Sequence, residues 1–202
     1  MARTLVAWLA VPALLLASCG EKIGSSGGTG AAADTVPAGL LFPDNFKGVC
    51  SGASVSTATA YDPAAKAHKA LYFATYKDDL LDQSSSLPPD WTVQFAPNRN
   101  ALAAIDLVAC AKRTAAQQVK VCDGYKKDDV VTQNKVRWHT ATYELSVREA
   151  RTGKELAKTT VEANDADCPM FQSFDNETET VDRYASLPDS AVTDFLRSHI
   201  AP

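Results

Sequence analysis

The chain has 202 residues, with 20 basic and 24 acidic side chains and a formal net charge of −4. Because the two signs are interspersed and the excess is acidic, the composition argues against nucleic-acid binding and against adhesion to anionic lipid. After residue 38 no apolar stretch approaches the roughly 18 residues that a membrane-spanning helix needs. Residues 39–202 are long enough for one domain with a hydrophobic core.

The first residues have the pattern of a secretory signal peptide. Arg3 supplies a positive charge, and residues 5–16 form an almost wholly apolar run interrupted by Pro12. A helix of this length would span about 18 Å, whereas the hydrocarbon core of a bilayer is about 30 Å thick. The run is too short to remain as a transmembrane anchor, and we interpret residues 1–18 as a signal peptide.

The apolar run ends in Leu16-Ala17-Ser18-Cys19, which resembles the lipobox of bacterial lipoproteins. In that class a diacylglycerol is attached to the cysteine thiol and the preceding peptide is removed. The resemblance therefore implies that Cys19 becomes the first residue, bears acyl chains such as palmitate, and holds the protein on the outer side of a bacterial membrane. The alternative is an ordinary signal peptide with an incidental Cys19, which would leave an odd number of cysteines in an exported protein.

The segment that follows is rich in Gly, Ser and Ala and has hardly any side chain that could join a core. This composition predicts a flexible coil over residues 19–38. Eighteen residues of such a coil have a root-mean-square reach of roughly 21–25 Å. We expect a tether that lifts the domain of residues 39–202 clear of the lipid headgroups.

The first half of that domain contains several expected strands. A short helix is predicted from Asp62, with Pro63 at its first position. Residues 69–76 and 91–97 are interpreted as strands. Residues 105–122 are interpreted as a hairpin with its polar turn near Ala116, an arrangement that places Cys110 opposite Cys122.

The four cysteines beyond Cys19 are expected to form disulfides, because an exported domain meets oxidising conditions. Three pairings are possible. We favour Cys110–Cys122, since directly opposed strand residues have the Cα separation that a bridge needs, and therefore Cys50–Cys168. A zinc site is the alternative, but the sequence has no C-x-x-C and no histidine at ligand spacing from a cysteine.

The clearest local pattern is a hairpin over residues 143–161, where apolar and polar residues alternate on both sides of Arg151-Thr152-Gly153. Gly153 stands where a three-residue hairpin loop needs a left-handed backbone. Val136 and Trp138 are apolar residues at even positions, whereas Tyr143, Leu145 and Val147 are at odd positions, so we expect a β-bulge near His139. The predicted register pairs Val147 with Ala157, Leu145 with Thr159 and Tyr143 with Val161.

The C-terminal region changes to a helical period. Ser186 is a predicted N-cap, and Val192, Phe195 and Leu196 share one face of an amphipathic helix that should cover a sheet. The predicted fold class is α+β, with a mainly antiparallel sheet of about six strands and this helix packed on it.

Catalytic motifs are lacking, and His139 is a weak candidate. It lies beside Trp138 near the expected bulge, where a side chain can be re-aimed, although a locally bonded histidine on a sheet face is the plainer interpretation. His199, in the last turn of the predicted helix, fits a capping role better than catalysis.

Acidic side chains flank Cys168 and offer oxygens to a hard cation. Asp165, Asp167, Asp175 and Glu177 are weak candidates for a calcium site, although no fixed ligand spacing supports one and solvated loops look the same. No other cofactor is indicated.

These features favour a binding or scaffolding module of the bacterial cell envelope, held by the lipid on Cys19 and able to contact an envelope protein. The two alternatives are a secreted hydrolase that uses carboxylates, with His139, and a carrier of a small apolar ligand. A pocket with convergent charged groups would favour the hydrolase, and an enclosed cavity would favour the carrier.

Overall fold

The computed structural model describes residues 39–76, 79–97, 99–165 and 167–200, all of which belong to one compact unit. The expected signal peptide, Cys19 and the tether lie outside the described residues. Within the part of the chain that is described, no helix is long and apolar enough to cross a membrane.

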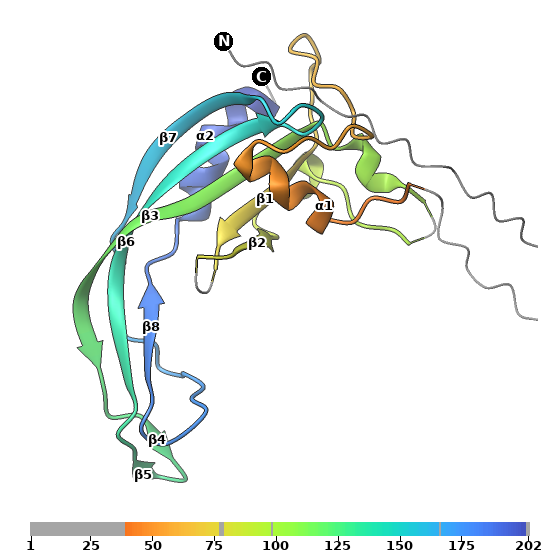
Figure 1. Cartoon of the computed structure of the whole chain (residues 1–202). Coiled ribbons are helices and arrows are strands. Elements are labelled where there is room, and N and C mark those ends of the chain that lie inside the picture. Colours follow the sequence, from red (N-terminus) through yellow and green to blue (C-terminus); the bar gives the residue numbers. More distant parts are fainter. Residues whose placement is uncertain (1–38, 77–78, 98, 166, 201–202) are drawn as a thin grey trace, which may run out of the picture. The chain divides into compact units, whose positions relative to one another are not determined.

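The centre of the fold is a six-stranded mixed sheet in which β3 and β6 are much the longest strands (Figure 1). Five strands follow the order β2-β1-β3-β6-β7, and β8 pairs with the part of β6 that β7 leaves free. The β1–β3 and β6–β8 pairs are parallel and the others are antiparallel. The α+β prediction is confirmed. The strands are β1 (Ala70–Thr75), β2 (Leu81–Ser84), β3 (Leu107–Cys122), β6 (Lys135–Glu149), β7 (Glu155–Ala163) and β8 (Thr180–Tyr184).

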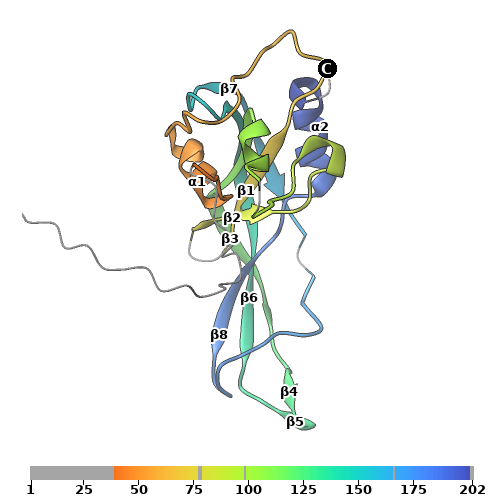
Figure 2. The same cartoon turned by 90° about the vertical axis from the view of Figure 1, so that its right-hand side faces the viewer.

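Two helices cover opposite faces of this sheet (Figure 2). On one face α2 (Asp189–Ile200) buries Val192, Leu196 and Ile200 against the sheet, which confirms the predicted C-terminal helix. Its predicted N-cap is wrong, because the helix begins at Asp189, three residues after Ser186. On the other, α1 (Asp44–Lys47) and a following 3-10 turn bury Phe46 and Val49. The remaining short elements are η1 (Gly48–Ser51), η2 (Pro89–Trp91), η3 (Ala101–Ala104), β4 (Lys126–Lys127) and β5 (Val130–Val131).

The predicted hairpin over residues 105–122 is wrong, because β3 runs through this region as one continuous strand. Its second half is exposed on both faces, so the polar residues on either side of Ala116 look like a turn between two strands. Twelve residues of strand separate Cys110 from Cys122, roughly 40 Å at 3.3 Å per residue, so these two cysteines cannot form a disulfide. The bridges are instead Cys50–Cys110, inside the core beside α1, and Cys122–Cys168 at the far end of the strand.

Two weaker predictions in the first half of the domain are also wrong. Residues 92–97 are irregular, and Val93 packs against the core from this loop without joining the sheet. The edge of the sheet beyond β1 is formed instead by β2, a largely exposed strand without apolar alternation. At Asp62 the chain makes only a turn, in which the Ala65 amide donates to the Asp62 carbonyl.

The hairpin of β6 and β7 has the predicted register, with Val147 opposite Ala157 and Tyr143 opposite Val161. Gly153 has a φ of +75°, as its turn requires. The bulge expected near His139 lies in the partner strand, between Gln118 and Lys120 of β3.

The distal halves of β3 and β6, with β8 beside β6, extend beyond the part of the sheet that the helices cover, and β4 and β5 lie at their end (Figure 1). We call this extension the arm. Val136 is buried on the arm face that also carries Cys122, its strand partner. This change of buried face explains the opposite phase of Val136 in the sequence.

Candidate binding site at the end of the arm

The end of the arm, which we call the tip, consists of residues 122–135 and the described residues of 164–179. The Cys122–Cys168 disulfide joins the end of β3 to the second segment. On the same face of β6, the Trp138 indole N–H donates to the Asp165 carbonyl at 2.6 Å. The loop therefore enters the tip at a fixed place even though it has no regular secondary structure.

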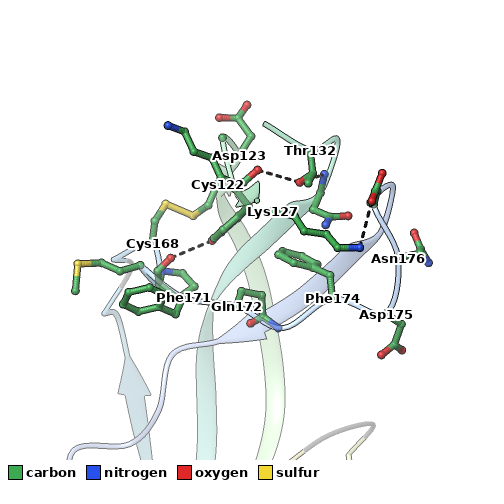
Figure 3. Close-up of a pocket in the computed structure, with 17 residues that line it drawn as sticks. Cys122, Asp123, Lys127, Thr132, Cys168, Phe171, Gln172, Phe174, Asp175 and Asn176 are labelled. Atoms are coloured by element: carbon green, nitrogen blue, oxygen red, sulfur yellow. Dashed lines mark hydrogen bonds and ion pairs between the residues drawn. A yellow bond between two sulfur atoms is a disulfide. The ribbon is translucent and has the colours of Figure 1, made fainter. Parts of the chain in front are cut away.

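Contacts between the two segments hold the tip together (Figure 3). The Tyr125 hydroxyl donates to the Pro169 carbonyl at 3.2 Å, and the Tyr125 ring packs edge-on against Phe174 at a centroid distance of 5.1 Å. Lys127 Nζ lies 3.2 Å from Glu177 Oε1. These contacts come from both sides of the space between the segments, so they define the walls of a cavity.

The cavity has a volume of about 660 Å³. Met170 and Phe171 lie in its wall yet are 87% and 89% exposed, and Val130 and Val131 of the neighbouring β5 are exposed as well. Isolated exposed apolar residues are common, but two adjacent ones in the wall of a cavity form a surface of the kind that binds other molecules.

The tip is also where the acidic excess of the chain is concentrated. Residues 122–135 and 164–179 contain eight Asp or Glu side chains and three Lys side chains, an excess of five negative charges, whereas the whole chain has an excess of four. An apolar surface in such surroundings attracts cationic molecules and repels anionic ones.

The four calcium candidates all lie in the second segment of the tip, and the contacts they make are separate ones, that of Asp175 being through its backbone amide alone. The Asp165 carboxylate accepts from the Asp167 amide, and Glu177 pairs with Lys127. The Asp175 amide donates to Glu179. Across the described residues there is no group of three or more His, Cys, Asp or Glu side chains placed to hold a metal ion.

His139 lies on the α2 side of β6, about halfway along the arm, and has a carboxylate partner in β8. Its Nε2 is 2.8 Å from Asp182 Oδ1, and its ring stacks on Tyr184 at 4.9 Å. Arg137 donates two hydrogen bonds to the same carboxylate, and these hold the pKa of Asp182 below its usual range. His139 does not line the tip cavity, so the candidate base and the candidate calcium residues are not brought together.

No family model, curated protein or solved structure matches this chain. The site's shape, apolar surface and charge suit the binding of a polypeptide that presents both apolar and basic side chains.

Sequence reasoning did not select Met170 and Phe171. Their signal is weak, because two apolar residues directly after Cys168 have no strand or helix periodicity and could as well have been core residues. The Cys122–Cys168 bridge and the nearby β4–β5 ladder place them at the tip, and neither feature follows from local pattern.

Proposed function

We propose that this protein is a binding module of the bacterial cell envelope, anchored through a lipid on Cys19, that captures a partner protein at its tip. The observation that carries the proposal is the exposed pair Met170 and Phe171 in the wall of the acidic tip cavity.

The tip suits binding because the backbone that leads to its exposed apolar residues is held in place before a partner arrives. The bridge at Cys168 and the hydrogen bond to Pro169 fix the chain immediately before Met170. A backbone segment that is ordered in advance loses less conformational entropy on association, so more of the contact energy contributes to affinity. Truncating a central aromatic anchor of this kind commonly costs 2 kcal/mol or more, on the order of a thirtyfold loss.

The location rests on two kinds of support. The two disulfides fit an oxidising, extracytoplasmic setting. The lipid anchor rests on the lipobox resemblance at Cys19. Metabolic labelling with a fatty acid should mark the wild-type protein and leave Cys19→Ala unlabelled, whereas equal labelling of both would refute the anchor.

The tip is tested by a photo-crosslinking residue at position 171 of the full chain in intact bacteria. We expect a discrete adduct with a protein partner that is basic at the contact. The matched control is position 80, because Leu80 is 69% exposed but lies in the β1–β2 connection, outside the tip. An identical set of adducts from both positions, or no adduct from position 171, would refute the proposal.

The charge preference has a separate test. Asp123 and Asp175 line the cavity, and their carboxylates make no hydrogen bond or ion pair to another described residue. Asp123→Asn with Asp175→Asn should therefore reduce the adduct at position 171 without unfolding the tip. The wild-type adduct should also weaken as salt concentration rises, since exposed charges are screened within about 10 Å at 0.1 M salt. If neither the double substitution nor added salt lowers the yield of the adduct, the partner is not recognised through basic side chains.

A further inference from the structure

A second cavity, of about 190 Å³, lies on the α2 side of the sheet, between β1, β2 and the start of α2. Unlike the tip cavity, it is lined mainly by hydroxyl groups. The residues that contribute them are Tyr72, Thr75, Ser84, Ser86, Tyr143 and Ser186.

The Tyr72 hydroxyl is the observation that points to a ligand. The residue is only 4% exposed, yet its hydroxyl has no hydrogen-bond partner among the described residues. The Tyr72 hydroxyl is not sealed inside the protein, because among the described residues the one fully enclosed side-chain polar atom without a partner is Arg148 Nε. The hydroxyl therefore opens onto the cavity that Tyr72 lines. Burial, with Tyr143 and Asp189 nearby, raises the pKa of Tyr72, so the phenol stays neutral and can donate as well as accept.

The hydroxyls around Tyr72 are held by the protein itself. Tyr143 donates to the Ala185 carbonyl at 2.9 Å, and the hydroxyls of Ser84 and Ser86 are 3.1 Å apart. Thr75 Oγ1 accepts from the Arg113 amide at 2.9 Å. Each fixed hydroxyl keeps at least one lone pair or proton for a further bond, so the cavity presents an ordered polar wall.

Asp189 is the one charged residue among those lining this cavity. Within the described parts of the chain its carboxylate forms no ion pair. Arg113 lies close enough to act on Tyr143 of the cavity wall, but its guanidinium already pairs with Asp79 and stacks on Tyr184 at 3.5 Å. Asp189 already provides the negative charge that the N-terminus of α2 favours, so a second anion is disfavoured there.

We propose that this cavity binds a small hydroxylated molecule that carries an ammonium group, of about the size of an amino sugar. The hydroxyl wall would bond the ligand hydroxyls, Tyr72 would supply the free donor, and Asp189 would pair with the ammonium. At about 30 Å³ per water the volume corresponds to roughly six waters, which limits the ligand to a monosaccharide or less.

The test is calorimetric titration of the full chain, produced with its own N-terminal segment and purified in mild detergent, with glucosamine and with glucose as probes. We expect saturable binding of glucosamine and roughly two- to fivefold weaker binding of glucose, which lacks the ammonium that would pair with the exposed Asp189. Tyr72→Phe keeps the ring in the core and should weaken glucosamine binding about tenfold. Asp189→Asn should remove the preference for glucosamine over glucose.

Tyr125→Phe is the matched control, because it removes a tyrosine hydroxyl at the tip and should leave glucosamine binding unchanged. No saturable heat with glucosamine up to about 10 mM, equal affinity for both sugars, or equal loss in Tyr72→Phe and Tyr125→Phe would overturn the proposal. The outcome is independent of the crosslinking result at position 171.

Discussion

Adding a single Cβ atom at Gly153 tests how closely the turn between β6 and β7 packs against residues 52 and 53. Its φ of +75° is a left-handed conformation that side chains rarely adopt. In addition, a Cβ at Gly153 would lie 2.5 Å from the Ala53 carbonyl oxygen and would also collide with the backbone of Gly52. Alanine at Gly153 therefore meets two separate penalties, one local and one tertiary.

Gly124 provides the matched control, because its φ is +78° and a Cβ there would meet nothing within 4 Å. Left-handed backbone costs alanine about 1–2 kcal/mol. The lower entropy of the unfolded chain returns about 0.4–1 kcal/mol of this. We therefore expect Gly124→Ala to lower the free energy of unfolding by about 1 kcal/mol.

Gly153→Ala adds the cost of forcing two backbone segments apart. Overpacking of this kind costs about 1–3 kcal/mol, so the total loss should be about 3 kcal/mol. The movement would also strain the hydrogen bond from the Val55 amide to the Ala150 carbonyl, which is 3.0 Å long. Urea unfolding followed by tryptophan fluorescence measures both variants. Equal losses for Gly153→Ala and Gly124→Ala would refute the close approach to Ala53.

Three further predictions concern other parts of the fold. Arg137 lowers the pKa of Asp182, so this ion pair contributes its full stability above the usual carboxyl pKa of about 4 and loses it as pH falls through the lower folded-state pKa. Below about pH 4, the free energy of unfolding in urea should therefore fall less steeply with pH for Asp182→Asn than for the wild type. Parallel pH curves for the two proteins would contradict the pairing. Leu196→Ala should cost about 2–5 kcal/mol in the same assay, because this α2 side chain is fully buried between the helix and the sheet, and a loss below 1 kcal/mol would argue against that packing. Replacing both Cys122 and Cys168 by serine removes a bridge across 46 residues and should lower the free energy of unfolding by about 4 kcal/mol on the chain-entropy model. Non-reducing peptide mapping of the wild type that joined either cysteine to another partner would contradict the connectivity.

Parts of the fold could be predicted because their information is local. In β6 and β7 the buried face alternates strictly, so pattern and turn together fix the pairing of Val147 with Ala157. The stripe of Val192 and Leu196 likewise identifies α2. In α2 one face is buried along the helix, and in β6 one face is buried over residues 141–147, the part that pairs with β7.

The disulfides and the tip could not be predicted in the same way. The second half of β3 is exposed on both faces, so its polar residues near Ala116 look the same as a turn between two strands. A turn near Ala116 would place Cys110 opposite Cys122, whereas the continuous strand keeps these two cysteines far apart. Their partners come from segments distant in the chain, which no local pattern identifies.

By itself, therefore, the sequence determined the α+β class, the β6–β7 register and the C-terminal helix, because residues a few positions apart carry those signals. Only the tertiary structure decided which cysteines pair, that Met170 and Phe171 share the tip with the acidic excess, and that Tyr72 faces a cavity with Asp189. These arrangements depend on contacts between distant segments, and such contacts are set by how the long strands extend and bend in space.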